Sequence, residues 1–325
     1  MNHAIRIHEH GGPEVLRWEE VPMPSPGPGE ALVKHAAVGL NYIDIYFRTG
    51  LYKPPALPAT IGMEGAGTVE AVGEGVTDLK PGDRVAYATA PIGAYAQYRT
   101  LKADRLVKLP DAIGFEMAAA MMLQGMTAEY LLRRTFKVQP GQTILIHAAA
   151  GGVGLIMCQW AKHLGATVIG TVSSDEKAAL AKAHGCDHPI VYTREDFQAR
   201  VKEITGGKML PVVYDSVGRE TFMKSLDCLA PLGLMVSFGN ASGAVPPFEI
   251  GLLAAKGSLF LTRPTLASYT AKREDLAASA AALFEVVQKG AVKIEVNQRF
   301  PLKDAAEAHR ALEGRRTTGS TVLIP

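Results

Sequence analysis

The segment that most constrains the fold is the run 148–154, which reads Ala-Ala-Ala-Gly-Gly-Val-Gly. It follows an apolar, strand-like run at 143–147 and leads into a helix-like run at 153–164. Read as the G-x-G-x-x-G pattern of dinucleotide-binding turns, it has Ala149 in the first position and glycine in the other two. The alternative interpretation is an ordinary strand-to-helix turn, which any α/β protein can contain.

The glycines of this run predict how a nucleotide would be held. Gly151 has no Cβ, so the backbone can approach a pyrophosphate, and Gly154 allows close packing of the helix on the strand. The start of the helix at Gly152 and Val153 presents N–H groups and a partial positive charge to the phosphates. We therefore expect Gly151, Gly152 and Val153 to bind the cofactor.

Strands and helices alternate after this turn, which predicts an α/β fold with a doubly wound parallel sheet. Parallel strands joined by helices of about ten residues form right-handed crossover units. The expected strands are 167–172, 189–192, 212–215 and 234–238, and the expected helices are 175–184 and 195–204.

The chain before about residue 110 has a different texture. Short strand-like runs, such as 31–34, 65–69 and 84–87, alternate with turns rich in glycine and proline. This pattern predicts a β-rich unit. Alanine, methionine and leucine then predict helix over 116–132, broken at Gln124-Gly125.

The end of the chain combines helices with further strands, so we expect it to return to the β-rich unit. The sequence predicts helices at 273–289 and 303–313 and strands at 292–296 and 321–324. The expected organisation is a β-rich domain of residues 1–123 and 264–325 and a dinucleotide-binding domain of residues 124–263.

Composition excludes several classes of protein. Of the 325 residues, 47% are hydrophobic and 20% are charged, as in ordinary globular proteins. The net charge of +2 predicts no nucleic-acid binding. No apolar run approaches the roughly 18 residues of a membrane span, and the N-terminus lacks the apolar core of a signal peptide. We expect a cytoplasmic protein that does not bind membranes.

Cysteine occurs only at Cys158, Cys186 and Cys228. An odd number without a C-x-x-C pair argues against a disulfide framework and fits a reducing compartment. All three cysteines lie in the second half of the chain, which leaves the first half without a thiolate ligand, and we expect no metal. His147, at the end of an apolar strand, and Cys158, inside an apolar helix, are expected to be packed residues.

The second expected strand indicates which cofactor is bound. An acid that binds the ribose 2′-hydroxyl of NADH would stand at its end, about 20 residues after the glycine turn. The tip instead carries Ser173 and Ser174, followed by Lys177, with Tyr192 after the next strand. Ser174, Lys177 and Tyr192 could form a 2′-phosphate pocket, and the missing acid favours NADPH. Asp175 and Glu176 leave a ribose contact, and so NADH, as the alternative.

The whole chain resembles the medium-chain dehydrogenase/reductase superfamily, and within it the zinc-free, zeta-crystallin-like quinone oxidoreductases. The resemblance implies a GroES-like β-rich catalytic domain and a Rossmann domain. Zinc-containing relatives carry a cysteine and a histidine at the positions that read Asn41 and Met63 here. The segments that carry the resemblance include Gly39-Leu40-Asn41-Tyr42-Ile43-Asp44, Gly62-Met63-Glu64-Gly65-Ala66-Gly67, Val213-Tyr214-Asp215-Ser216-Val217-Gly218 and Thr262-Arg263-Pro264.

The resemblance also implies roles for individual residues. The expected substrate pocket consists of Asn41, Asp44, Tyr46 and Tyr52. The expected cofactor contacts, besides those already given, are Asn41, Tyr46, Thr127, Ser216, Phe238, Gly239, Asn240, Arg263 and Arg315.

The activity implied is reduction of quinones by hydride transfer from NADPH without a metal. Positioning of the reactants would supply the catalysis, so we expect no essential acid or base. The alternative is reduction of the activated C=C bond of an enone or enoyl thioester, for which Tyr46 or Tyr52 could donate a proton. The resemblance further implies a homodimer, with 259–262 as a candidate edge strand.

Overall fold

The computed structural model describes residues 1–88 and 90–325. The chain forms two compact units, each assembled from segments far apart in the sequence. The β unit contains Met1–Met126, Thr270–Phe284 and Ile294–Pro325, and the α/β unit contains Thr127–Tyr269 and Glu285–Lys293. These boundaries differ from the expected ones, because residues 124–126 belong to the β unit and residues 264–269 and 285–293 belong to the α/β unit.

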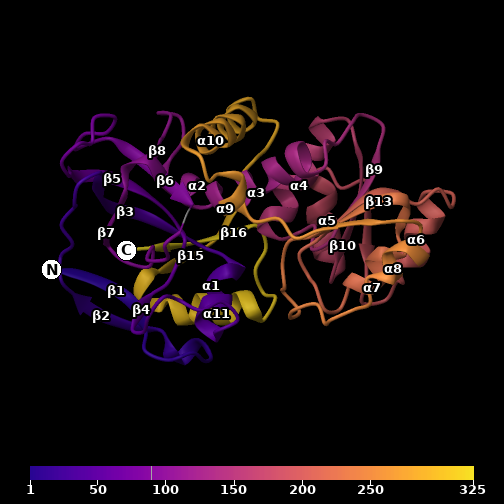
Figure 1. Ribbon diagram of the computed structural model, residues 1–325, viewed down its shortest axis with the longest axis horizontal. Coiled ribbons are helices and arrows are strands. Elements are labelled where there is room, and N and C mark those ends of the chain that lie inside the picture. The colour runs from indigo at the N-terminus through magenta and orange to yellow at the C-terminus, as the bar shows by residue number, and fades with distance from the viewer. Residues whose placement is uncertain (89) are drawn as a thin grey trace. The chain divides into compact units, whose positions relative to one another are not determined.

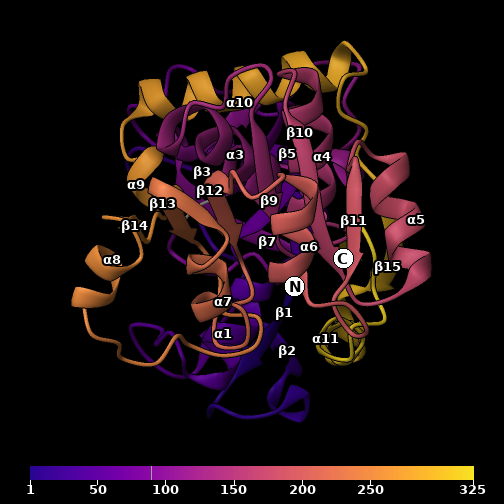
Figure 2. The same cartoon turned by 90° about the vertical axis from the view of Figure 1, so that its right-hand side faces the viewer.

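The α/β unit is built on a six-stranded sheet in the order β11-β10-β9-β12-β13-β14. All neighbouring strands are parallel, and helices lie on both faces of the sheet (Figure 2). The strands are β9 Thr143–Ile146, β10 Thr167–Val172, β11 His188–Val191, β12 Leu210–Asp215, β13 Leu229–Ser237 and β14 Phe260–Thr262. The helices are α4 Gly152–His163, α5 Asp175–Ala183, α6 Phe197–Ile204, α7 Phe222–Leu226, α8 Gly251–Ala255 and α9 Leu266–Tyr269.

The predicted alternation of strands and helices is confirmed in this unit. Most strand residues are buried, as they must be in a parallel sheet covered on both faces. The strand order reverses between β9 and β12, and folds of this kind bind ligands outside the carboxyl ends of the strands at that point.

The β unit contains two sheets. The larger has the order β15-β16-β3-β5-β6-β8, with β7 also paired to β3, and the smaller has the order β2-β1-β4. Figure 1 shows the first and last strands of the chain together in this unit. The strands are β1 Asn2–Ile7, β2 Arg17–Val21, β3 Glu30–Leu40, β4 Ala59–Thr60, β5 Glu64–Val72, β6 Arg84–Ala88, β7 Tyr98–Lys102, β8 Val107–Lys108, β15 Val296–Pro301 and β16 Ser320–Ile324.

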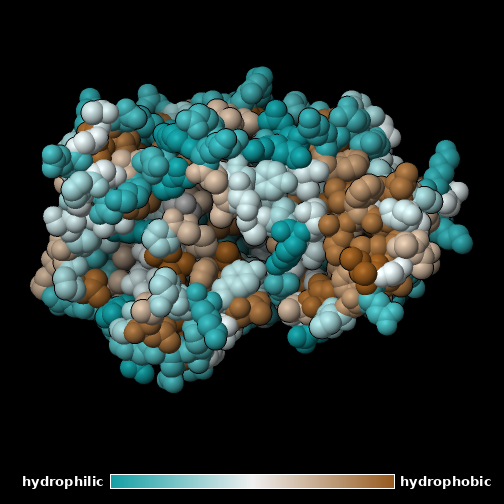
Figure 3. Space-filling view, viewed as in Figure 1, coloured by the Kyte–Doolittle hydropathy of each residue, from teal (hydrophilic) through white to brown (hydrophobic). Residues whose placement is uncertain are grey.

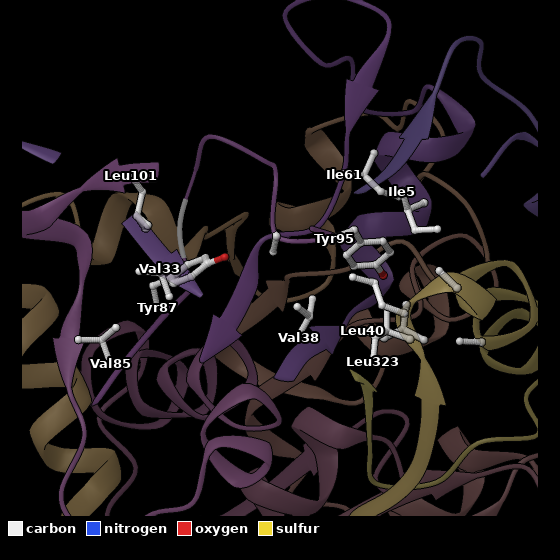
Figure 4. Packing of buried hydrophobic residues seen from close by; sticks show 14 of the residues in the cluster. Ile5, Val33, Val38, Leu40, Ile61, Val85, Tyr87, Tyr95, Leu101 and Leu323 are labelled. Carbon is white, nitrogen blue, oxygen red and sulfur yellow. The ribbon is translucent and has the colours of Figure 1, made fainter. Parts of the chain in front are cut away.

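One apolar cluster forms the core of the β unit (Figure 4). It includes Ile5 of β1, Val33 of β3 and Leu323 of β16, none of which has any exposed surface. Tyr95, in the loop before β7, is also fully buried within it. Burial of each such side chain stabilises the fold by about 1.5–3 kcal/mol. Because β1 and β16 both contribute to this core, it joins the first and last strands of the chain.

Short helical segments complete the chain. They are η1 Pro13–Val15, α1 Tyr42–Thr49, η2 Ala103–Arg105, α2 Phe115–Ala119, α3 Met122–Tyr130, the π-helical turn Leu131–Thr135, α10 Arg273–Gln288, η4 Leu302–Asp304 and α11 Ala305–Glu313. Within residues 1–88 and 90–325, no helix has the length and apolar character needed to cross a membrane.

The helix predicted over 116–132 is interrupted at a different place from the one expected. The break lies at Ala120-Met121, between α2 and α3, and Gly125 is inside α3. A Cβ on Gly125 would lie 2.5 Å from Cδ1 of Leu283 in α10. The prediction of a break at Gln124-Gly125 was therefore wrong, because this glycine permits close helix packing and does not end a helix.

The strand predicted at 292–296 was also misplaced, since β15 begins only at Val296 and pairs with β16. Val292 is buried, and its N–H donates to the Val286 carbonyl, so the start of this run folds back on the last turns of α10.

Candidate functional site

The glycine turn places an open helix terminus at the carboxyl end of β9. Gly151 is the N-cap of α4, and neither a side-chain cap nor an acid lies in the first turn. A Cβ on Gly154 would lie 2.3 Å from the Ala148 carbonyl oxygen, so only glycine permits this close packing. Ala148 itself has a positive φ of 54°. The turn thus offers uncapped amides at Gly152 and Val153, as an anion-binding helix start requires.

The tip of β10 carries the residues expected to distinguish the two cofactors. Ser174 is the N-cap of α5, and its hydroxyl accepts a hydrogen bond from the Lys177 amide over 3.3 Å. Ser173 precedes it, and Tyr192, at the end of β11, is 37% exposed. The two serines and Lys177 therefore surround the first turn of α5 at this edge of the sheet.

The acidic alternative at this tip is already paired. The Asp175 carboxylate binds the Arg194 guanidinium, and this hydrogen bond is the main reason that the pKa of Asp175 is lowered. Sequence reasoning missed Arg194, since no pattern connects it with Asp175 nineteen positions earlier. The pair leaves Glu176 as the other acid at the start of α5.

The loops after β12 and β13 are held tightly against each other. A Cβ on Gly239 would lie 2.4 Å from the Ser216 carbonyl oxygen, which explains the glycine. Arg263 donates from Nη1 to the carbonyls of Ser237 and Gly239, over 2.9 and 3.2 Å. Its guanidinium therefore supports the loop 237–240, which contains the predicted contacts Phe238, Gly239 and Asn240.

Apart from Thr127, the predicted contacts of the α/β unit thus follow the carboxyl ends of the parallel strands β9 to β14 at one edge of the sheet. A hollow at this edge is lined in part by His147, Thr171, Tyr192 and Val217. His147 is buried between the hydroxyls of Thr171 and Ser225, each 2.8 Å from a ring nitrogen, and burial lowers its pKa. It is a packed residue, as expected. Thr127 lies in α3 and is also buried.

Asp215, at the end of β12, is a buried acid for which sequence reasoning predicted no role. Its carboxylate accepts hydrogen bonds from the amides of Val217 and Gly218, over 2.8 and 3.0 Å, and from the Thr221 hydroxyl, over 2.7 Å. Asp215 therefore shapes the turn that carries Ser216.

The predicted substrate residues Asn41, Asp44, Tyr46 and Tyr52 lie together on α1 and the turn after it. Tyr46 stacks edge-on against Tyr52, with ring centroids 5.3 Å apart. Asn41 is the N-cap of α1, and its backbone N–H donates to Oδ2 of Asp44 over 2.9 Å. Arg315, the remaining predicted contact in the β unit, follows α11 and is exposed.

Asp44 cannot line a pocket directly, because its side chain has no exposed surface. Its Oδ2 accepts a second hydrogen bond from the Tyr95 hydroxyl over 3.0 Å, whereas Oδ1 is buried without a partner. Burial raises the pKa of Asp44 to about 7. The prediction is corrected to a positioning role, in which Asp44 holds the backbone of Asn41.

A second buried acid, Glu64, holds the Asn41 side chain. Its Oε2 accepts from Asn41 Nδ2 over 2.7 Å, and its Oε1 accepts from the Leu123 amide over 2.7 Å. Burial raises the pKa of Glu64 to about 8. Glu64 follows Met63 directly, but sequence reasoning gave it no role, because nothing in the sequence places it beside Asn41.

In the described part of the chain, no group of three or more His, Cys, Asp or Glu side chains is arranged to hold a metal ion. Cys158, Cys186 and Cys228 are buried and unbridged. The hydrogen bond with Cys186, together with burial, raises the pKa of Cys158 well above its usual value, so this thiol is inert at neutral pH.

Comparison with known proteins identifies the family. Residues 27–111 match the alcohol dehydrogenase GroES-like domain, and residues 152–284 match the zinc-binding dehydrogenase family. A quinone oxidoreductase of Pseudomonas aeruginosa is 56% identical over 325 residues, with 100% of each chain covered. The chain belongs to the quinone oxidoreductases of the medium-chain dehydrogenase/reductase superfamily. It is therefore an oxidoreductase, and the predicted GroES-like and Rossmann folds are confirmed.

Two further members of this superfamily bear on cofactor and substrate. The crystal structure of the Escherichia coli quinone oxidoreductase complexed with NADPH has a TM-score of 0.98 and 51% identity, covering 99% of this chain and 100% of that one. A 2-haloacrylate reductase of a Burkholderia species is 48% identical, covering 99% of this chain and 98% of its own.

Proposed function

We propose that the chain reduces quinones with NADPH by direct hydride transfer, without a metal. The observation that carries the cofactor assignment is the tip of β10, where Ser173 and Ser174 replace an acid and Asp175 is occupied by Arg194. A free carboxylate at this tip would repel a 2′-phosphate. The similarity to a quinone oxidoreductase complexed with NADPH supports the same assignment.

The α/β unit fits the cofactor in two places. The uncapped start of α4, at Gly151, Gly152 and Val153, suits a pyrophosphate, and the contact at Gly154 keeps this helix close to the sheet. Ser174, Lys177 and Tyr192 would hold the 2′-phosphate. The loops with Ser216 and with Phe238, Gly239 and Asn240, together with Thr127, complete the proposed contacts, whereas Arg263 acts through the loop it supports.

The proposed quinone contacts are Asn41, Tyr46 and Tyr52 of the β unit, with Arg315 as a further cofactor contact. When bound, NADPH would supply a hydride, which carries two electrons, and a proton from water would complete the hydroquinone. The residues orient the flat acceptor and exclude water, so catalysis depends on positioning. We also propose that residues 1–123 and 264–325 form the catalytic domain and that residues 124–263 form the dinucleotide-binding domain.

Reduction of an activated C=C bond is the second candidate. It is favoured by one observation, the 48% identity to a 2-haloacrylate reductase. Such a reaction places hydride on one carbon and needs a proton on the other, for which Tyr46 and Tyr52 offer hydroxyl groups at the end of α1.

One spectrophotometric experiment separates these functions. Oxidation of NADPH and of NADH is followed with benzoquinone, an alkenal and 2-chloroacrylate as acceptors. We expect NADPH to exceed NADH and benzoquinone to exceed the other acceptors in kcat/KM. Faster turnover of the alkenal or of 2-chloroacrylate would favour the second candidate, and equal use of NADH would overturn the 2′-phosphate site.

We further propose a cytoplasmic homodimer joined through β14. This strand is at the edge of the six-stranded sheet, and its Phe260 is 60% exposed. Leu232 and Ile250 are also exposed, at 67% and 80%. Figure 3 shows apolar surface gathered over the region of β13 and α8. An open apolar strand edge of this kind favours pairing with a second copy.

A further inference from the structure

A row of buried polar side chains crosses the β unit from Glu64 to Ser320. Oε2 of Glu64 accepts from Nδ2 of Asn41 over 2.7 Å, and Oδ1 of Asn41 accepts from Nε2 of Gln124 over 3.2 Å. Oε1 of Gln124 then accepts from the Ser320 hydroxyl over 2.8 Å. None of the four residues is more than 7% exposed, so bulk water does not compete for these bonds.

The row has two self-consistent directions. An amide has a donating end and an accepting end, so the orientation of Asn41 dictates that of Gln124. Ser320 suits either direction, because a hydroxyl both donates and accepts. At the other end, a carboxylate can only accept, whereas a carboxylic acid also donates. Glu64 is therefore the member of the row whose protonation state can select the direction of the hydrogen bonds.

We propose that the proton on Glu64 sets the direction of this row, so that Asn41 and Gln124 turn over together when Glu64 is protonated. In the acid state the Glu64 hydroxyl donates to Asn41 Oδ1, Asn41 Nδ2 donates to Gln124 Oε1, and Gln124 Nε2 donates to Ser320. The only change in composition is one proton taken from water, and no other bond is made or broken.

Buried donors make the coupling obligatory. If Glu64 gained its proton while Asn41 stayed in place, the new O–H donor would face the Asn41 NH₂ group and find no acceptor in the row, and a buried donor without a partner is strongly disfavoured. Turning both amides restores every bond within the row, and the Asp44 amide, which faces the Asn41 side chain at the start of α1, keeps its bond to the Asn41 carbonyl. The Leu123 amide binds the other Glu64 oxygen, Oε1, and that bond persists in both states.

The surroundings of Glu64 bring its pKa into the pH range that ordinary buffers cover. Burial raises its pKa to about 8, and the nearby charge of Asp44 acts in the same direction. The titratable groups that face it, among the residues that the structure describes, are Asp44 from α1 and Tyr87 from β6. A Cβ on Gly39 would lie 2.4 Å from Glu64 Oε2, so glycine leaves β3 close to the acid.

The link to catalysis rests on the proposed function, in which Asn41 contacts the quinone. Turning the amide exchanges the positions of the Asn41 NH₂ group and carbonyl oxygen. It therefore changes which of the two can contact the quinone. Glu64 is then a positioning residue, and we expect the KM for benzoquinone to change with the Glu64 proton more than kcat does.

Side-chain amide resonances test the inference directly. In ¹⁵N-labelled protein, the NH₂ signals of Asn41 and Gln124 are assigned by their loss in Asn41→Ala and Gln124→Ala and followed from pH 6 to 9.5. We expect both to move with one common midpoint near pH 8. The Gln159 amide, held by the carbonyls of Leu155 and Lys293 in the α/β unit, serves as the reference that should not follow them. Separate midpoints for Asn41 and Gln124, or no movement of either, would overturn the inference.

Glu64→Gln removes the proton but keeps the shape, so the common midpoint should disappear. The matched control is Glu30→Gln, at a partly exposed β3 acid that binds the Gly27 amide, and it should keep the midpoint. A midpoint that survives in Glu64→Gln contradicts the inference. The spectra require no turnover, so absence of quinone reduction at every pH would count against the proposed function and not against the row.

Discussion

The Arg48 guanidinium of α1 binds the Glu313 carboxylate of α11 through two hydrogen bonds, of 2.6 and 2.9 Å. Arg48 also faces Nδ1 of His309 at 3.1 Å. Since arginine only donates, His309 carries its proton on Nε2 and donates it to the Tyr95 hydroxyl over 3.0 Å. Tyr95 then donates to Asp44. A chain of donors thus leads from the C-terminal helix to the start of α1.

Arg48→Ala should lower the free energy of unfolding by about 1–3 kcal/mol, because it removes a buried side chain and leaves the buried His309 without its donor, whereas Glu313 is partly exposed. Urea unfolding at pH 7 measures the loss. The control is Lys102→Ala, which removes an exposed ion pair with Glu30 at 3.5 Å and should cost about 0–1 kcal/mol. Equal losses in the two variants would contradict the importance of this chain.

Asp44→Asn should change how stability depends on pH. The pKa of Asp44 is raised to about 7 in the folded state, above its ordinary value. Between about pH 4 and 7 the folded protein therefore holds a proton that the unfolded chain has released, and stability falls as pH rises, by up to about 1.4 kcal/mol per pH unit. The variant lacks this loss, so its stability relative to the natural protein should increase from pH 4.5 to 7.5.

Asp83→Asn is the control for this experiment, because its shift has the opposite sign. A hydrogen bond from Lys108 lowers the pKa of Asp83, so its contribution is present at neutral pH and is lost only in acid. Urea titrations at several pH values should show no relative gain for this variant as pH rises. A parallel pH dependence of Asp44→Asn and the natural protein would refute the prediction.

Gly154→Ala should weaken NADPH binding. The added Cβ would meet the Ala148 carbonyl oxygen at 2.3 Å, which displaces α4 from the glycine turn. We expect the Kd for NADPH to rise about tenfold or more, equivalent to about 1.4 kcal/mol, by fluorescence titration. Gly251→Ala, at the start of α8 with no atom near the added Cβ, should bind NADPH normally. Similar affinities for the two variants would show that the turn tolerates the shift.

Lys177→Ala should reduce the preference for NADPH over NADH. A lysine bound to the 2′-phosphate contributes about 1.5–3 kcal/mol, so we expect at least a tenfold rise in the Kd for NADPH. The Kd for NADH should not change. Lys182→Ala, in the last turn of the same helix, is the matched control and should leave both values unaltered. Equal weakening of NADPH and NADH would place Lys177 outside the 2′-phosphate site.

Phe260→Glu should dissociate the proposed dimer, because a charge on the edge strand β14 opposes pairing with a second copy. Light scattering after size exclusion would then report the mass of one chain. Met23→Glu, at a 45% exposed site in the β unit, should remain dimeric. If Phe260→Glu keeps the mass of the natural protein, the interface lies elsewhere.

The α/β unit was predictable because its signals are local. Short apolar runs mark β9, β10, β11 and β12, and α5 begins at Asp175, where the sequence predicted a helix to start. The proposed contacts at the glycine turn and at the tip of β10 follow from the same logic, since the carboxyl ends of neighbouring parallel strands meet at one edge, whereas Thr127, Arg263 and Arg315 came from the family resemblance. Arg194 escaped notice because its ion pair with Asp175 depends on how the loop after β11 meets the start of α5.

The β unit was less predictable because its site depends on contacts between distant segments. Glu64, Gln124 and Ser320 reach Asn41 or its partners from three parts of the chain, and no spacing in the sequence connects them. Gly125 looked like a helix break, although its role is to admit Leu283. The sequence shows only that such residues are polar or small, and their roles become clear from the contacts they make in the folded unit.

The position of β16 has a consequence for biosynthesis. This strand, Ser320–Ile324, lies between β3 and β15, and the helix that carries His309 and Glu313 precedes it. The larger sheet of the β unit therefore cannot be completed until residues 320–324 have left the ribosome. All six strands of the other sheet are contained in residues 143–262 and emerge earlier. The sheet of the α/β unit, which we propose binds the nucleotide, is thus translated in full before the sheet of the β unit, which contains Asn41.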